Sequence, residues 1–193
     1  MPESEKISIQ TLIDQMGTAQ RKNRLKAAEY IIEHPEYFKD LLDLVFKVKY
    51  KYHYKAAWIL EFVLEKNLNW LFPHLDFFTK NLYLLKNDSA IRPIAKICQC
   101  LATAYMKQKK LIYIHHLEHK YIERIVETGF DWMIGNYKIA SQVYTMDTLY
   151  YFGCIPLENY EWIHPALKNI ILQNSASKSA GYQTHGKKIL KLI

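Results

Sequence analysis

The spacing Trp-x-x-Pro-x-Leu occurs twice in this chain, as Trp70, Pro73 and Leu75 and again as Trp162, Pro165 and Leu167. The second copy follows the first by 92 residues, which is two units of about 46, a period found in two-helix repeats. Proline is tolerated in the first turn of a helix, because the amide groups there have no partner inside the helix. The sequence therefore predicts repeated helical units, with Trp70 and Trp162 at equivalent places where two helices begin.

Apolar residues recur at helical spacing along most of the chain, and turn residues separate the runs. In RKNRLKAAEYIIEHP, residues 21–35, an apolar stripe ends at Pro35. Four later segments share a pattern of small and aliphatic residues that begins near a turn: 53–64, 90–102, 138–153 and 181–193. Matching their residues Lys55, Arg92, Ala140 and Gln183 relates them by steps of 37, 48 and 43 residues. The unequal steps indicate equivalent helices joined by loops of unequal length.

The stretch KVKYKYHYK, residues 47–55, alternates basic and mostly aromatic side chains with the period of a β-strand. A lone strand among helices would have no partner for its backbone hydrogen bonds. We therefore interpret the stretch as a helix end, a turn and the start of the next helix. Tyr54 and Lys55 are expected in that next helix, and the lysines are expected to be solvated.

NDSAIRPIAKICQCLA, residues 87–102, predicts a helix capped by Asp88 or Ser89 with Ala95 and Leu101 facing inward. This segment resembles the second helix of a HEAT repeat. From about residue 20 to the end, the chain resembles the HEAT/armadillo class of α-α superhelices. The resemblance implies an all-α, right-handed α-α superhelix, a HEAT-like solenoid of about five helix pairs, in a single domain over 1–193. Such repeats bury their neighbouring faces and bind partners on a concave face.

The chain carries 26 Lys and Arg residues against 19 Asp and Glu residues, a formal net charge of +7, which favours acidic or polyanionic partners. Lysines and arginines that follow a nucleic-acid backbone bind its phosphates, and aromatic rings can stack on unpaired bases. The candidate nucleic-acid-binding residues are Arg21, Lys22, Arg24, Lys47, Lys49, Lys51, Lys55 and Arg92. The other interpretation is that the tyrosines pack between repeats while the lysines keep the surface hydrated.

Possible metal ligands are few. His115 and His119 have the spacing at which two histidines on one helix can hold zinc, but no third ligand is specified by spacing, so we interpret them as a surface cluster. Cys98 and Cys100 would point apart on a helix, and three cysteines give no disulfide framework, which favours a reducing compartment. We expect no metal and no cofactor.

Two further resemblances concern enzymes. Trp58 with Glu61, and Tyr144 with Asp147, place an aromatic ring and an acid on one helix surface, and HEAT-like DNA alkylation repair glycosylases pair such residues on their concave face. No motif maps onto theirs, so no catalytic residue is assigned. The segments KAAWILEFV and QVYTMDTLYYFG resemble a group of short bacterial proteins named adenylosuccinate lyase. The lyase signature SSxMPxKxN is missing, since NSASKSAG, residues 174–181, has neither its Met nor its Pro.

The sequence thus predicts a non-enzymatic helical-repeat scaffold, cytoplasmic and without a membrane segment, that binds a protein partner through its concave face. The alternative is a nucleic-acid-binding module related to the helical-repeat glycosylases. A mixed-charge or apolar concave face would favour the scaffold. A basic face lined by aromatic side chains would favour nucleic acid.

Overall fold

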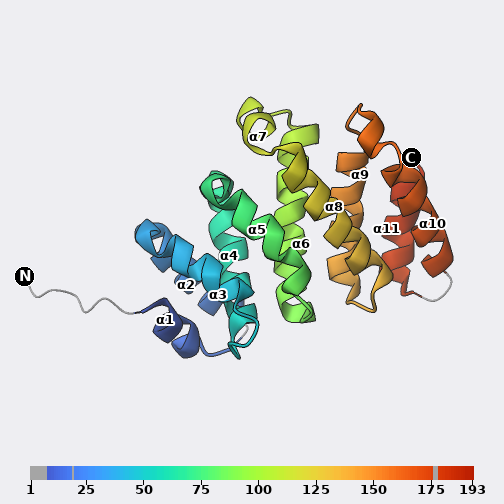
Figure 1. Cartoon of the computed structure of the whole chain (residues 1–193). Coiled ribbons are helices and arrows are strands. Elements are labelled where there is room, and N and C mark those ends of the chain that lie inside the picture. Colours follow the sequence, from blue (N-terminus) through green and yellow to red (C-terminus); the bar gives the residue numbers. More distant parts are fainter. Residues whose placement is uncertain (1–7, 19, 176–177) are drawn as a thin grey trace, which may run out of the picture.

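The computed structural model describes residues 8–18, 20–175 and 178–193, and within them every regular element is helical. The expected all-α class is therefore confirmed. The α-helices are α1 (Ile9–Gln15), α2 (Arg21–Glu33), α3 (Phe38–Phe46), α4 (His53–Lys66), α5 (Leu75–Asn81), α6 (Asp88–Ala102), α7 (Leu111–His116), α8 (His119–Ile134), α9 (Ile139–Gly153), α10 (Ile163–Ser175) and α11 (Ala180–Leu190). Figure 1 shows the N-terminal helices at one end of the molecule and α10 and α11 at the other.

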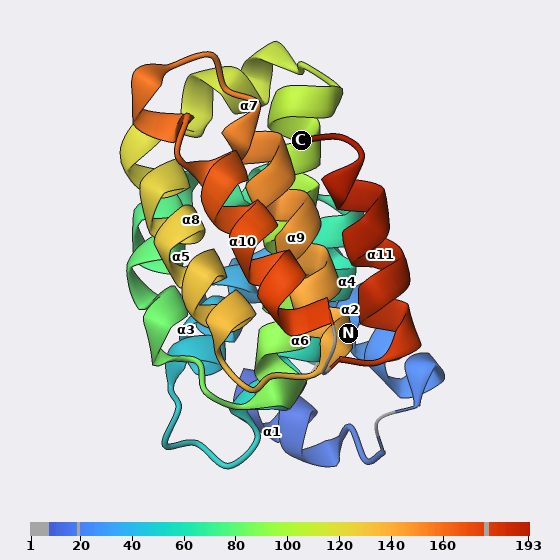
Figure 2. The ribbon, with the colours of Figure 1, turned by 90° about the vertical axis from the view of Figure 1, so that its right-hand side faces the viewer.

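The helices form two layers, and the chain alternates between them. Helices α2, α4, α6, α9 and α11 each pack on the next and make the first layer, while α3, α5, α8 and α10 lie on the other side. Figure 2, which looks along the row of helices, shows the two layers side by side. The four segments that share a sequence pattern are α4, α6, α9 and α11. They all lie in the first layer.

The core lies between the layers and between neighbouring helices of the first layer. Helix α4 packs against α2, α3 and α6, and it buries both Ile59 and Leu60 completely. A helix that is covered on several sides needs apolar residues around most of its circumference, as AAWILEFVLE has. In α6, Ala95 and Leu101 are fully buried, as the sequence predicted. The cap of α6 is Asn87, whose side chain accepts a hydrogen bond from the Ser89 amide, and not Asp88 or Ser89.

The stretch KVKYKYHYK forms the turn between α3 and α4, and α4 begins at His53, so the interpretation as a turn is confirmed. Lys47, Lys49 and Lys51 are exposed, but Lys55 is not solvated: it is 7% exposed. Its ammonium lies 4.2 Å from the centre of the Tyr52 ring. A lysine stem can be buried where an aromatic face receives its charge, so the prediction of a solvated side chain was wrong for this residue.

The two Trp-x-x-Pro-x-Leu segments are not fully equivalent. Trp162 directly precedes α10, whereas Trp70 lies in the short 3₁₀ helix Leu68–His74 that precedes α5. Trp162 is 50% exposed, while Trp70 packs edge-on against Phe38 with 5.6 Å between ring centres. The chain winds through a tighter helix around Pro73, and the equal spacing in sequence therefore places the two rings differently.

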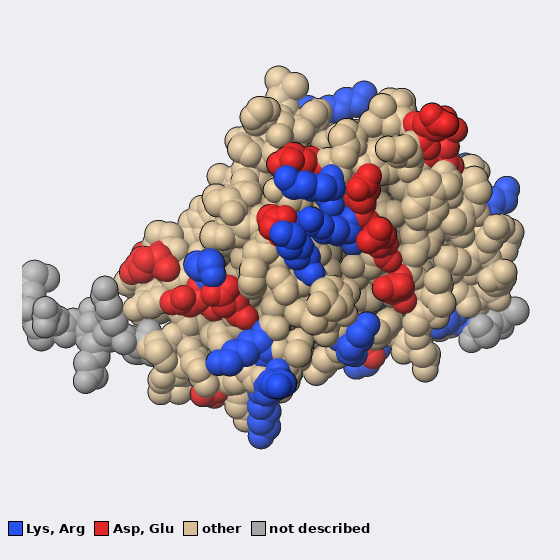
Figure 3. Space-filling model, in the orientation of Figure 1, with Lys and Arg blue, Asp and Glu red and all other residues tan. Residues whose placement is uncertain are grey.

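The outer surface of α5 and α8 carries both signs of charge. Figure 3 shows a basic group over these helices with Asp and Glu side chains on either side of it. Asp76 accounts for part of this pattern, since it accepts hydrogen bonds from Lys80 at 2.7 Å and from Arg124 at 2.9 Å. The charge of Asp76 is therefore compensated by two cations of this face.

Candidate functional site

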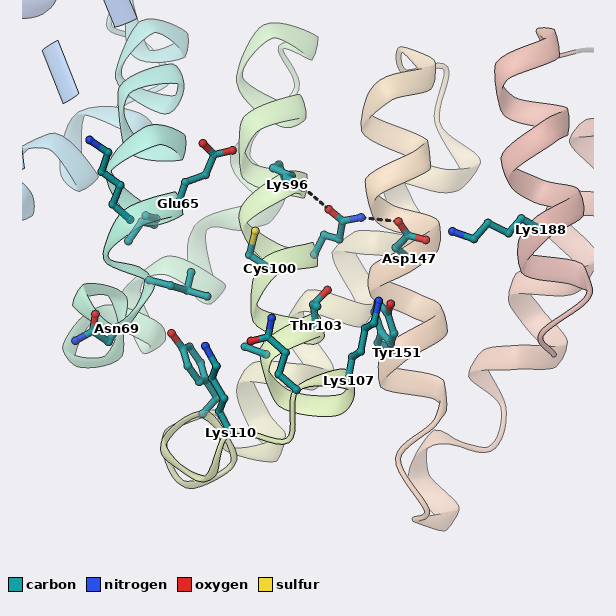
Figure 4. Close-up of a pocket in the computed structure, with 17 residues that line it drawn as sticks. Glu65, Asn69, Lys96, Cys100, Thr103, Lys107, Lys110, Asp147, Tyr151 and Lys188 are labelled. Carbon is teal, nitrogen blue, oxygen red and sulfur yellow. Dashed lines mark hydrogen bonds between the residues drawn. The ribbon is translucent and has the colours of Figure 1, made fainter. Parts of the chain in front are cut away.

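A groove crosses the first layer of helices. It consists of two adjoining pockets, of about 760 Å³ and 330 Å³, which share Glu65 and Lys96. Figure 4 shows the larger pocket, with side chains converging from α4, α6, α9 and α11. The polar residues of the two pockets, together called the basic groove, are Arg21, Arg24, Glu61, Glu65, Lys66, Asn69, Arg92, Lys96, Gln99, Cys100, Thr103, Lys107, Gln108, Lys110, Tyr113, Tyr144, Asp147, Tyr151 and Lys188.

Helical spacing explains why these side chains share one surface. On α6, Arg92, Lys96 and Gln99 follow one another at intervals of three or four residues, which places them in one stripe that Thr103, the first residue after the helix, continues. On α9, Tyr144, Asp147 and Tyr151 do the same. The opposite sides of these helices are buried, as Cys98 and Leu149 are. Helices α6 and α9 thus turn polar stripes toward the groove.

The groove is strongly basic, because eight Lys or Arg side chains line it against three carboxylates. Two of the three carboxylates are already engaged. Glu61 accepts a hydrogen bond of 2.5 Å from Arg92, and Asp147 accepts one of 2.5 Å from Gln99 and one of 2.9 Å from His185. The protein therefore leaves most of the positive charge in the groove without an internal counter-charge.

Five lysines give the larger pocket its charge: Lys66, Lys96, Lys107, Lys110 and Lys188. Among the described residues, none of the five forms an ion pair; the lysine pairs there use Lys39, Lys80 and Lys120. Lys96 donates a hydrogen bond of 2.9 Å to Gln99, and its ammonium lies 5.0 Å from the centre of the Tyr144 ring. In Figure 4, Lys188 extends from α11 toward Asp147. These ammonium groups are available to an anion.

A wide helical turn positions Lys107. Residues Thr103–Lys107 form a π-helix at the end of α6, and the Gln108 amide donates to the Thr103 carbonyl at 2.9 Å, five residues back. The next residue, Lys109, has a φ of 47°, in the left-handed region that side chains other than Gly rarely adopt. Turns of this kind are frequent at functional sites. Here the turn brings Lys107 and Lys110 to one wall of the groove.

At the α2 end of the groove, two arginines lie over aromatic rings. The guanidinium of Arg24 is 5.4 Å from the centre of the Phe62 ring and 5.7 Å from that of Trp58, and Arg21 is 5.1 Å from that of Phe62. Burial, with the nearby charge of Arg92, lowers the pKa of Arg24. Its buried Nε atom has no hydrogen-bond partner. The arginine is therefore held by ring contacts, which leaves hydrogen-bonding capacity unused.

Glu61 and Asp147, the acids of the two aromatic-acid pairs, both line the groove. Burial raises the pKa of Glu61, and the charge of Arg92 opposes that effect. The aromatic partner suggested for Glu61 is also engaged, since the Trp58 indole donates to the Ser89 carbonyl at 2.8 Å. Asp147 likewise serves Gln99 and His185. Each of the two aromatic-acid pairs therefore has an acid that is bound into a network of the protein itself.

The predicted nucleic-acid-binding residues fall into separate places. Arg21, Arg24 and Arg92 line the basic groove, Lys22 is exposed on α2, and the others belong to the turn before α4 or, as Lys55, are buried. Sequence reasoning missed Lys66, Lys96, Lys107, Lys110 and Lys188. Lys96 could have been identified from the sequence, because it follows Arg92 by four residues on the same predicted helix and therefore lies on the same face.

His115 and His119 do not lie one turn apart on a single helix, the arrangement that could hold zinc. His115 lies in the last turn of α7 and His119 begins α8, and the chain leaves the helical conformation at Leu117 and Glu118 between them. The histidines are exposed, as expected for a surface cluster. His119 shares a hydrogen bond of 2.8 Å with the Tyr160 hydroxyl. In the described part of the chain, no group of three His, Cys, Asp or Glu side chains could hold a metal ion.

The comparisons with protein-family models, with curated proteins and with solved structures find no match to this chain. None of the helices in the described ranges combines the length and apolar character that crossing a membrane requires. The function must therefore be inferred from the groove.

Proposed function

We propose that this chain is a HEAT-like α-α superhelix protein of about five helix pairs that binds nucleic acid in its basic groove. The observation that carries the proposal is the charge of the groove: eight cationic side chains against three carboxylates, two of which are already bonded to groups of the protein. The alternation of the chain between two layers supports the repeat architecture.

Phosphate groups would compensate the unpaired lysines and arginines. Each cation that neutralises a phosphate releases condensed counterions, so a groove of this charge has a strong, salt-dependent attraction for a nucleic-acid backbone. Tyr144 and Tyr151 lie half-buried on the same α9 stripe, where their rings can contact bases. Aromatic side chains in a basic groove are the arrangement that distinguishes nucleic-acid binding from a neutral protein-binding face.

A matched pair of triple variants tests the proposal. Lys96→Gln/Lys107→Gln/Lys110→Gln removes three charges from the groove, and Lys47→Gln/Lys49→Gln/Lys51→Gln removes three from the exposed turn between α3 and α4. Binding to single-stranded and duplex oligonucleotides of equal length is measured by fluorescence anisotropy at several salt concentrations. The groove variant should bind at least tenfold more weakly, and its salt slope should be flatter by roughly one unit for each phosphate that is no longer neutralised.

The turn variant should bind as the unchanged protein does, and both variants should keep the melting temperature within a few degrees. Equal losses in both variants would mean that only net charge matters, which would contradict the groove. No salt-sensitive binding to either oligonucleotide would end the nucleic-acid proposal. A protein partner would then be the better proposal, and the charge of the groove would require an acidic segment of that partner.

A further inference from the structure

A second hollow lies in the other layer, between α8 and the turn that leads into α10. Its volume is about 400 Å³, within the range of pockets that hold small ligands or single side chains. The residues that line it are Glu123, Val126, Glu127, Asn159, Tyr160 and Trp162. The charge of this acidic hollow is opposite to that of the basic groove, since its charged residues are the two carboxylates Glu123 and Glu127.

Trp162 is held in place although half of its surface is exposed. One contact is the stacked Phe130 ring, with 5.0 Å between ring centres and 30° between planes. The other is a hydrogen bond of 2.9 Å from its indole nitrogen to the Asn159 carbonyl. A large aromatic ring that is fixed but 50% exposed leaves apolar surface in water. Such a ring is pre-organised for a ligand, because little side-chain freedom remains to be lost on binding.

The two carboxylates lack counter-charges. Glu123 and Glu127 are four residues apart on α8, where like charges destabilise a helix. Among the described residues, neither forms an ion pair, and the neighbouring cations Lys120 and Arg124 pair with Glu118 and Asp76 instead. Figure 3 shows the Asp and Glu side chains over α8 and a further acidic group over the turn before α10. A cation bound here would relieve this repulsion.

Tyr160 forms the buried floor of the hollow. It is 2% exposed, and its hydroxyl shares a hydrogen bond of 2.8 Å with His119. Burial, with a contribution from the Glu123 charge, raises the pKa of Tyr160 to about 12. The floor is therefore a neutral ring that is anchored to α8, and the negative charge belongs to the rim.

We propose that this acidic hollow binds an arginine or lysine side chain from a basic segment of a protein partner. The cation would lie on the accessible part of Trp162 and donate charge-assisted hydrogen bonds to Glu123 and Glu127. A protein is favoured as the source because the same turn also exposes Leu157, at 45%. Exposed aromatic and aliphatic groups beside a charged pocket are typical of protein interfaces.

The probe is a capped glycine-rich peptide with several arginines, and its neutral counterpart contains citrulline at the same positions. Binding is followed by calorimetry and by Trp fluorescence, to which the exposed Trp162 should contribute. We expect the arginine peptide to bind and the citrulline peptide not to bind. Glu123→Gln/Glu127→Gln should weaken binding at least tenfold. The control Glu29→Gln/Glu33→Gln changes the net charge equally at two exposed residues of α2, which are also four residues apart but lie outside the hollow, and it should change affinity less than twofold.

Three results would overturn the proposal. One is the absence of arginine-peptide binding at millimolar concentration, and another is an equal loss in the two double variants. The third is spermidine binding as tightly as the peptide, which would point to a free cation and not to a protein segment. Unchanged melting temperatures in both double variants show that the comparison reports on binding. Because this site is separate from the basic groove, its outcome is independent of the nucleic-acid proposal.

Discussion

The indole nitrogen of Trp58 donates a hydrogen bond of 2.8 Å to the carbonyl of Ser89, which is the carbonyl that Pro93 leaves unpaired within α6. A residue at position 93 with an amide hydrogen would donate to the carbonyl four residues earlier, but proline has none. The side chain of α4 therefore completes the backbone of α6. This bond ties together two neighbouring helices of the first layer, and it explains why a proline is accommodated inside a helix.

The first prediction follows from that bond. Trp58→Phe keeps a ring but removes the donor, so the Ser89 carbonyl loses its partner and the free energy of unfolding should fall by about 1–3 kcal/mol. In a Pro93→Ala background the helix can supply its own donor, so the cost of Trp58→Phe should be smaller. Urea unfolding of the four proteins measures this coupling. Equal costs in both backgrounds would contradict the assigned role.

The second prediction concerns the pair of Glu61 and Arg92. The Glu61 side chain is 6% exposed, so Arg92→Leu would leave a buried carboxylate without a partner and should cost about 3–5 kcal/mol near neutral pH. Because burial raises the folded-state pKa of Glu61, its ionised form opposes folding, and removing Arg92 would strengthen that effect. The deficit should therefore be smallest below the ordinary pKa of a glutamate and should grow as pH rises through the raised value.

The matched control for that pair is Arg92→Leu combined with Glu61→Gln. The neutral amide removes the buried charge, so the double variant should be more stable than Arg92→Leu alone and its deficit should depend less on pH. Unfolding curves at several pH values provide the measurement. If Arg92→Leu lowered the free energy of unfolding equally at all pH values, the buried charge of Glu61 would not be the cause of that loss.

The third prediction concerns Asp76 on the outer surface. Hydrogen bonds from Lys80, followed by those from Arg124, hold its pKa below the ordinary value of an aspartate. A lowered folded-state pKa gives stability that is present above the unfolded-state pKa and is lost as pH falls through the folded one. Asp76→Asn should therefore lower the melting temperature at neutral pH but not in strong acid. Glu29→Gln, at an exposed position in the middle of α2 that forms no ion pair among the described residues, is the control and should change the melting temperature less at neutral pH.

The fourth prediction concerns the junction of α8 and α9. The side-chain amide of the fully buried Gln142 donates to the carbonyls of Trp132, Met133 and Gly135, which end α8. Gln142→Leu would leave these acceptors without that donor and should cost about 1–3 kcal/mol. Gln173→Leu, at an exposed position of α10, should change stability by less than about 0.5 kcal/mol. Similar effects of the two substitutions would show that the hydrogen bonds from Gln142 contribute little to stability.

Local pattern predicted the helices because apolar spacing and turn residues act over short distances. It correctly made 47–55 a turn and placed Ala95 and Leu101 inward. The predictions were wrong where contacts between side chains determine the outcome. Lys55 is buried over the Tyr52 ring, and Asn87, not Asp88 or Ser89, caps α6. These outcomes depend on which side chain reaches which neighbour, and spacing along one helix does not contain that information.

The candidate site was only partly predictable for the same reason. Arg21, Arg24 and Arg92 were identified by their charge, but their separation from the turn lysines depends on which helices lie side by side. Lys107 and Lys110 reach the groove through a π-helical turn, for which helical periodicity gives no signal. The acidic hollow brings Glu127 next to Trp162 from distant parts of the sequence, and only the packing of α8 against α10 does so.

The sequential packing of the first layer also has a consequence for how the chain opens. Helix α6 is covered by neighbours on both sides, α4 and α9, whereas α2 and α11 each end the row. In such an array, unfolding starts where a helix has one neighbour and advances inward. Amide hydrogens should therefore exchange with solvent fastest in the terminal helices and slowest in α6. A ligand spanning the groove from Arg24 to Lys188 would join the two ends and slow exchange in both.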